Sequence, residues 1–227
     1  MRHHCDRFTV SIAIIGLLPV APAHAGGAEF FVNAQDSIYN AGRTGIQPVG
    51  KLPHSVALPA GTSCVVVSKV IGSLPCESPL GCVTMNPNNG APFLNDPDGN
   101  LGQVSESDNE GTATISGIAA PGAGYLVALF TPPGGPSGTA PPALNFTQSP
   151  FTSFRMLSPL LDQTFFVGDG RRGDDFGAFQ MFNVPAGAGS LYFGISDACD
   201  YHGPPGCYYD NGGKYLVRVL LSPQPCK

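Results

Sequence analysis

Oxygen-bearing side chains gather in one loop near the end of the chain. Asp197, Asp200, Asp210 and Asn211 fall within a short stretch that is also rich in Gly and Pro. Calcium ions in proteins take about six to eight oxygen ligands from carboxylates, amide side chains, backbone carbonyls and water. This combination of residue types therefore predicts a calcium site in the loop.

Two strand-like runs flank this loop. Ser190–Ile195 comes before it and Lys214–Leu221 after it, and both are rich in apolar residues. A loop held at each end by a rigid strand can bring several ligands to one point. We therefore expect the last two strands of the fold to position the site.

The whole chain has the pattern of an all-β protein. It contains 30 Gly and 23 Pro in 227 residues, and no long apolar period of 3.6 follows the N-terminal segment. About eight short runs between turn signals favour an all-β fold, a β-sandwich or jelly roll. The expected strands are Glu29–Val32, Ser63–Ile71, Thr112–Ile118, Tyr125–Phe130, Thr164–Val167, Gly177–Val184, Ser190–Ile195 and Lys214–Leu221.

The first 25 residues have the pattern of an export signal. Arg2 and Arg7 precede the apolar run Phe8–Val20, and Ala23-His24-Ala25 supplies a small-x-small cleavage site. The run is too short to span a membrane comfortably. We therefore expect a secreted or periplasmic protein that begins at Gly26 and has no transmembrane segment after cleavage.

The remaining residues, 26–227, are expected to form one β-sandwich domain. Segments near 75–111 and 132–150 are rich in Pro, Gly and polar residues and are interpreted as insertions. The sequence carries no signal for an oligomeric state.

Six of the seven cysteines follow the predicted cleavage site, and an even number in an exported chain favours disulfides. Zinc is the competing interpretation, but there is no CxxC pair, and only His54 and His202 follow the signal. Spacing favours the pairs Cys76–Cys82 and Cys199–Cys207, which leaves Cys64–Cys226.

Several functional classes lack their usual signals. The net charge is −5, and the sequence has no basic patch, which argues against nucleic acid as a partner. It also has no GxSxG, HExxH or phosphate-binding glycine loop. Neighbouring Asp174 and Asp175 would point to opposite faces of a strand and could not flank one bond. We therefore do not expect an enzyme.

The flanking strands and their loop resemble a known family. SLYFGISD and YYDNGGKYLVRV resemble the end of the PA-IL type of bacterial galactose lectin, and of related galactose-binding-like sandwich domains in exported bacterial proteins. Gly124–Phe130 and other earlier segments resemble the family more loosely. The resemblance implies a jelly-roll sandwich that binds Ca²⁺ in its terminal loop, where hydroxyls of the sugar complete the coordination of the ion.

Carried over by residue, the resemblance makes Asp197 the acidic calcium ligand and Asp210 with Asn211 the paired ligands. It also implies one backbone carbonyl within Gly203–Cys207 and another near Gly72–Cys76.

The sugar side of the resemblance is looser. Asp96 and Asp98 fall where the lectins contact sugar, but here a DPDG sequence replaces the family's loop, and a plain β-turn is an alternative. Tyr209 is a candidate for contact with a galactose-like glycan. Packing of this tyrosine against the disulfide is the alternative.

Two functional hypotheses therefore remain. The first is a calcium-dependent, lectin-like carbohydrate-binding protein. The second is an exported structural or extracellular-matrix protein with a calcium-stapled sandwich and no sugar site. An open coordination position beside Asp197 would favour the first.

Overall fold

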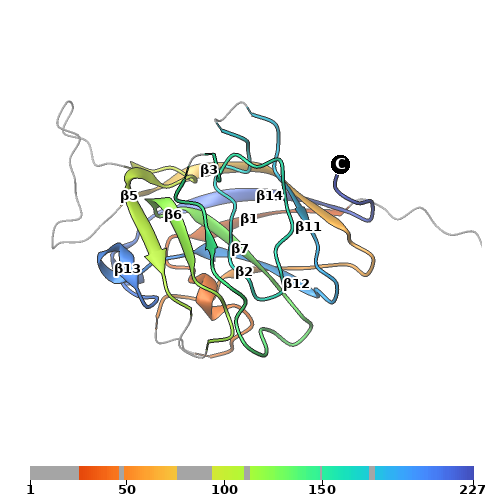
Figure 1. Cartoon of the computed structure of the whole chain (residues 1–227), viewed down its shortest axis with the longest axis horizontal. Coiled ribbons are helices and arrows are strands. Elements are labelled where there is room, and N and C mark those ends of the chain that lie inside the picture. The colour runs from red at the N-terminus through yellow and green to blue at the C-terminus, as the bar shows by residue number, and fades with distance from the viewer. Residues whose placement is uncertain (1–25, 46–48, 76–93, 110–112, 149, 174–176) are drawn as a thin grey trace, which may run out of the picture.

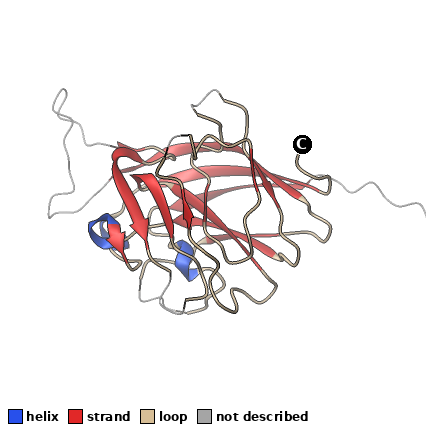
Figure 2. Cartoon of the chain, viewed as in Figure 1, coloured by secondary structure: helices blue, strands red, loops and turns tan. Residues whose placement is uncertain are grey.

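Strands dominate the fold, as Figure 2 shows. The computed structural model describes residues 26–45, 49–75, 94–109, 113–148, 150–173 and 177–227. Within them, helical structure is limited to three 3-10 turns, η1 (Ile38–Asn40), η2 (Cys199–Tyr201) and η3 (Tyr208–Asp210). The predicted all-β class is confirmed. The predicted export signal lies outside the described residues.

The largest sheet, here called the outer sheet, has the strand order β1-β14-β3-β11-β9, and β4 pairs with β3 beside this path. Antiparallel β14 lies between β1 and β3 along almost its whole length. These strands are β1 (Gly26–Asn33), β3 (Cys64–Pro75), β4 (Leu94–Asn95), β9 (Met156–Leu157), β11 (Met181–Asn183) and β14 (Lys214–Ser222).

The described residues form two further sheets (Figure 1). The central sheet has the order β10-β7-β12-β2, formed by β2 (His54–Ala57), β7 (Leu126–Thr131), β10 (Phe165–Phe166) and β12 (Ser190–Ile195). The third sheet has the order β13-β5-β6-β8, formed by β5 (Asn100–Ser107), β6 (Ile118–Ala123), β8 (Leu144–Asn145) and β13 (His202–Gly203).

Strand β7 shows why the central sheet lies in the middle. Every residue of this strand is buried. Successive side chains of a strand point to opposite faces. Accordingly, Ala128 and Phe130 join the core shared with the outer sheet, whereas Val127 and Leu129 join a second core with Ile118 of the third sheet. A continuous apolar run is what a strand covered on both faces requires.

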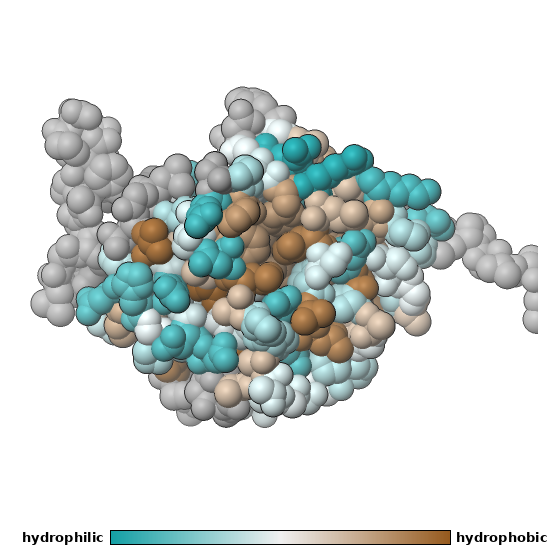
Figure 3. Space-filling view, in the orientation of Figure 1, coloured by the Kyte–Doolittle hydropathy of each residue, from teal (hydrophilic) through white to brown (hydrophobic). Residues whose placement is uncertain are grey.

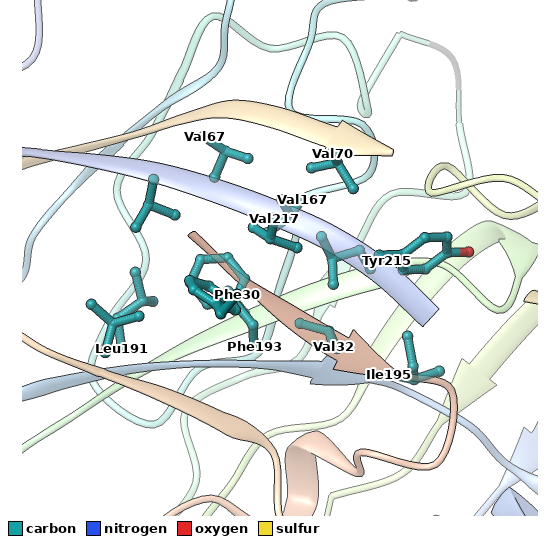
Figure 4. Close-up of a cluster of buried hydrophobic side chains, with 14 of the residues drawn as sticks. Phe30, Val32, Val67, Val70, Val167, Leu191, Phe193, Ile195, Tyr215 and Val217 are labelled. Carbon is teal, nitrogen blue, oxygen red and sulfur yellow. The ribbon is translucent and has the colours of Figure 1, made fainter. Parts of the chain in front are cut away.

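The first core fills the space between the outer and central sheets. Figure 4 shows Phe30, Val67 and Val217 from the outer sheet with Phe193 and Ile195 from the central sheet. Burial of such side chains contributes about 1.5–3 kcal/mol each relative to exposure. Figure 3 shows that one face of the molecule also carries hydrophobic residues near its middle, with more hydrophilic residues around them.

Most predicted strands overlap observed ones, but β2 and β5 were not predicted, and only Met181–Asn183 of the expected Gly177–Val184 forms a strand. One difference is Thr112–Ile118, where β6 begins only at Ile118 and continues to Ala123. The preceding backbone is diverted because Gly117 donates its N–H to the side chain of Asn109 and packs against the carbonyl of Ser107. Ile115 still enters the second core, but from a loop.

The segment near 75–111, interpreted as an insertion, contains a strand of the third sheet. Strand β5 pairs with β6 and with β13. Ser105 and Ser107 of β5 are buried, although they are polar. The segment near 132–150 is mostly loop and contributes the short strand β8, which pairs with β6.

One predicted disulfide ties the C-terminus to the outer sheet. Cys64, at the start of β3, is bonded to Cys226, which lies 162 positions later in the sequence. Cys64 is buried. The predicted Cys76–Cys82 pair lies outside the described residues.

No helix in the described part of the chain is long and apolar enough to cross a membrane.

Candidate metal and ligand site in the Asp197–Asn211 loop

The loop between β12 and β14 joins two different sheets. Strand β12 belongs to the central sheet and ends at Ile195, and β14 belongs to the outer sheet and begins at Lys214. Asp197 therefore lies two positions after a central strand, whereas Asn211 lies three positions before an outer one. The site lies at the end of the sandwich where the chain crosses between its layers.

The three predicted metal-binding residues lie together. The side-chain amide of Asn211 donates to Oδ2 of Asp197 at 2.6 Å. The charge of Asp210 acts on Asp197 as well. The side chain of Gln35 donates to the backbone carbonyl of Asn211 at 3.3 Å and so fixes this part of the loop from the N-terminal side of the molecule.

Burial dominates the electrostatics of Asp197. Removal from water is the largest influence and raises the pKa of its carboxyl group, the bond from Asn211 opposes this effect, and the nearby charge of Asp210 adds to it, so that the pKa lies at about 7 instead of the usual 3.8. Burial raises the pKa of Asp210 as well. The site thus holds two carboxyl groups whose negative charges are only weakly stabilised by hydration or by hydrogen bonds.

Tyr208 connects the two ends of the site. Its hydroxyl donates to the carbonyl of Ile195 at 3.0 Å and accepts the backbone N–H of Asp197 at 3.1 Å. The ring is buried in the first core. One side chain from η3 therefore forms hydrogen bonds with two backbone groups at the end of β12, next to the candidate ligands.

A buried group of hydroxyls lies on the other side of this strand end. The hydroxyl of Tyr39 forms hydrogen bonds with Ser107 and with Ser196, the latter at 3.0 Å, and the two serine hydroxyls are 2.7 Å apart. These residues come from η1, from β5 and from the position directly before Asp197. The group links the third sheet to the backbone of the site.

This hydroxyl group was not predicted from the sequence. Its one local signal is the spacing of Ser105 and Ser107, which places both side chains on the same face of a strand. That signal lay in the segment interpreted as an insertion.

The loop itself is closed by the predicted disulfide between Cys199 and Cys207. Inside it, Gly206 donates its N–H to the carbonyl of Asp197 at 3.1 Å, and Ala198 forms an antiparallel bridge with Pro205. Gly206 has no room for a side chain, because a Cβ atom would lie 2.9 Å from the sulfur of Cys199. The short ring of residues is therefore tightly packed.

Within the two segments for which the family resemblance implies carbonyl ligands, Gly203 and Gly72 have other partners. The carbonyl of Gly203 accepts the N–H of Asp108 at 2.8 Å and so faces the third sheet. Gly72 pairs with Tyr215 inside the outer sheet, and the early segment that reaches the site is instead the one that carries Gln35. Cys76 lies outside the described residues.

The predicted sugar-contacting carboxylates form a different local group. Asp96 to Gly99 is a β-turn, closed by a bond of 3.0 Å from the Gly99 N–H to the Asp96 carbonyl. Asp98 accepts the N–H of Asp169 at 2.9 Å. The turn packs on the hydroxyl of Tyr215, which donates to the carbonyl of Asp96 at 2.7 Å. By contrast, the N–H of Asp197 binds the hydroxyl of Tyr208, and Asp210 and Asn211 follow Tyr208 in and at the end of η3.

Tyr209 lies on the surface beside the candidate metal ligands. Its side chain is 75% exposed, and its hydroxyl is 4.0 Å from the sulfur of Cys207. Tyr201, also in the disulfide-closed loop, is exposed as well. Two aromatic rings are therefore accessible at the rim of the site.

The donor set fits calcium better than a transition metal. Within the described ranges, no group of three or more His, Cys, Asp or Glu side chains is placed to hold a metal ion. The candidate site has two carboxylates and one amide, so backbone carbonyls and water would have to supply the remaining ligands. Such all-oxygen coordination suits a hard cation such as Ca²⁺.

The comparisons with known proteins identify no relative. No family model matches this chain, and no curated protein or solved structure matches it either.

Proposed function

We propose that this chain is an exported, calcium-dependent carbohydrate-binding protein with a jelly-roll sandwich of the galactose-binding type. The observation that supports the proposal is the grouping of Asp197, Asp210 and Asn211 at one end of the sandwich, with a hydrogen bond of 2.6 Å between the first and the last. It is a binding protein in this proposal, with no catalytic residues.

The electrostatics favour a cation at this point. Two carboxyl groups are partly withdrawn from water, and the influences on the pKa of Asp197 include a second negative charge but no lysine or arginine. A divalent cation would offset both the loss of hydration and the repulsion between the carboxylates. Asp197, Asp210 and Asn211 would hold the ion, with the amide of Asn211 turned to present its oxygen.

The surroundings favour a ligand at the surface. Tyr209 exposes most of its ring next to Asp210. An exposed ring offers an apolar face to the C–H face of a sugar, while a calcium ion with an open position can bind sugar hydroxyls. A galactose-like glycan is the partner that the family resemblance implies. The two disulfides suit an oxidising, extracellular compartment.

The second candidate is an exported structural protein without a sugar site. The same bond between Asn211 and Asp197 supports it, because this bond holds the two sides of the loop together without an ion. In this case, the loop would serve to lock the outer sheet to the central one.

Calcium titration of the exported protein tests the proposal. Isothermal titration calorimetry should detect one calcium site in the wild type, and Asp197→Ala should lose it. Asp200→Asn is the matched control, because Asp200 is an exposed acidic residue of the same loop and asparagine also tolerates its positive φ angle of 56°. This variant should keep the wild-type affinity.

A glycan array with calcium or with a chelator then separates the two candidate functions. Binding of glycans that disappears with chelator and in Asp197→Ala supports the lectin-like function. Calcium binding without any glycan favours the structural protein. Absence of calcium binding in the wild type refutes the calcium site itself.

A further inference from the structure

The loop that carries the candidate site concentrates unusual backbone conformations. Five non-glycine residues in the described part of the chain have positive φ angles, and three of them lie between the bonded cysteines or at their end. These are Asp200 at 56°, Tyr201 at 66° and Cys207 at 62°. Residues other than Gly adopt this left-handed region at an energetic cost, which is smaller for aspartate than for most other residues.

The disulfide holds the chain in this conformation. Cys199 and Cys207 are separated by only eight positions, so their bond closes a small ring with little freedom. The left-handed turn at Cys207 directs the chain into η3, which places Tyr208, Asp210 and, at its end, Asn211. Such strained backbone persists only where the surrounding structure enforces it, and it is concentrated at functional and switching sites.

The two disulfides of the described structure differ in exposure. Cys199 lies on the surface, and Cys207 is half-buried. In the other pair, Cys64 is only 3% exposed. Attack on its partner Cys226 would release a thiolate at buried Cys64, where the charged form is poorly solvated. Exposed disulfides are reduced more readily than buried ones.

We propose that Cys199–Cys207 is a redox latch that keeps the calcium site in its binding shape. The proposal rests on the function proposed above and adds its regulation. With the bond intact, the turn at Cys207 holds η3 in place. Tyr208 then forms its hydrogen bonds at the end of β12, and Asn211 forms its hydrogen bond to Asp197. With the bond broken, Tyr201 and Cys207 can return to ordinary backbone angles, and the ligands separate.

The reductant is a protein or small-molecule dithiol. One of its thiolates attacks the sulfur of Cys199, which breaks the Cys199–Cys207 bond, forms a mixed disulfide and releases the thiolate of Cys207. This thiolate takes a proton from solvent. The second thiolate of the reductant then attacks the reductant's first sulfur, which is bonded to Cys199 in the mixed disulfide. This step releases Cys199 as a thiolate, which also takes a proton from solvent. Two electrons thus pass to the protein, and the dithiol becomes a disulfide.

Stepwise reduction tests which bond opens first. The exported protein is equilibrated with increasing dithiothreitol, and free thiols are trapped with N-ethylmaleimide and mapped by mass spectrometry. Cys199 and Cys207 should be labelled at a dithiol concentration at least tenfold lower than Cys64 and Cys226. Equal or reversed susceptibility of the two pairs would overturn the latch.

The consequence for the loop is measured without calcium. Hydrogen exchange should show that the amides of Tyr201 and Gly206, which are bonded to the carbonyls of Ala198 and Asp197, lose protection on selective reduction. Strand β14 should keep its protection. A loop that remains protected after reduction refutes the proposal, whatever the protein binds.

Calcium titration then links the latch to the site. Selective reduction, or the double variant Cys199→Ala/Cys207→Ala, should weaken calcium binding at least tenfold. The matched control, Cys64→Ala/Cys226→Ala, should retain the native affinity while melting at a lower temperature. Unchanged affinity after loss of Cys199–Cys207 refutes the regulation alone, whereas absence of calcium binding in the oxidised wild type refutes the proposed function instead.

Discussion

The side-chain amide of Asn211 donates to the carboxylate of Asp197 at 2.6 Å, and this bond joins the end of a central-sheet strand to the start of an outer-sheet strand. The acceptor is the carboxyl group whose pKa burial raises to about 7. The contact therefore couples the ionisation of one residue to the position of the loop.

The first prediction is that ionisation of Asp197 destabilises the metal-free protein. Because its pKa is higher in the folded state than the usual 3.8, the folded state holds the proton more tightly than the unfolded chain. The contribution of Asp197 to the free energy of unfolding should therefore fall as pH rises from about 4 to 7, by about 2–4 kcal/mol in total.

Urea denaturation in chelator at several pH values checks this, with Asp197→Asn as the comparison. The variant cannot ionise at this position, so its free energy of unfolding should not show this decrease with rising pH. Burial lowers the pKa of His54, which gives an opposite trend near neutral pH, but this trend is common to both proteins and cancels in their difference. Parallel pH profiles for the two proteins would contradict the prediction.

The second prediction concerns the hydroxyl of Tyr208. Tyr208→Phe should lower the free energy of unfolding by about 1–3 kcal/mol, because the carbonyl of Ile195 and the N–H of Asp197 both lose their partner in a buried place. Tyr209→Phe is the matched control one position away, where the ring is 75% exposed. It should change stability by less than about 0.5 kcal/mol. Equal effects in thermal or urea denaturation would count against this role of Tyr208.

The third prediction compares two buried tyrosines of the second core. Tyr39→Phe should destabilise by about 1–3 kcal/mol, since Ser107 and Ser196 lose a shared partner. The hydroxyl of Tyr125 lies near Ser105 and Ser196 but makes no hydrogen bond to any described residue. Tyr125→Phe should therefore be neutral or stabilising. A larger loss for Tyr125→Phe than for Tyr39→Phe, measured by urea denaturation, would show that the hydroxyl group is arranged differently.

The fourth prediction concerns the two disulfides. A cross-link stabilises by restricting the unfolded chain, and the effect grows with the length of the closed loop. Removal of Cys64–Cys226, with a separation of 162 positions, should cost about 5 kcal/mol, and removal of Cys199–Cys207, with a separation of 8, about 2.5 kcal/mol. Denaturation of the two double-alanine variants measures both values. A greater loss of stability from the short loop would contradict this order.

Local sequence patterns were sufficient for much of the fold and for the centre of the site. Strands β12 and β14 follow from their apolar runs, and the disulfides Cys64–Cys226 and Cys199–Cys207 follow from the number and spacing of the cysteines. Asp197 and Asn211 could be placed together because each lies within three positions of one of these strands. Such signals depend on neighbours in the sequence and do not require the tertiary structure.

The third sheet and the hydroxyl group were decided only by tertiary structure. Strand β5 ends in Ser105, Glu106 and Ser107, a polar pattern without a hydrophobic alternation, and strands of two residues such as β8 have no period at all. Their conformation comes from pairing with β6. Ser107 can be buried because it meets the hydroxyl of Tyr39, which lies 68 positions earlier in the chain. No local pattern encodes a compensation between residues so far apart, because it exists only once the sheets have packed together.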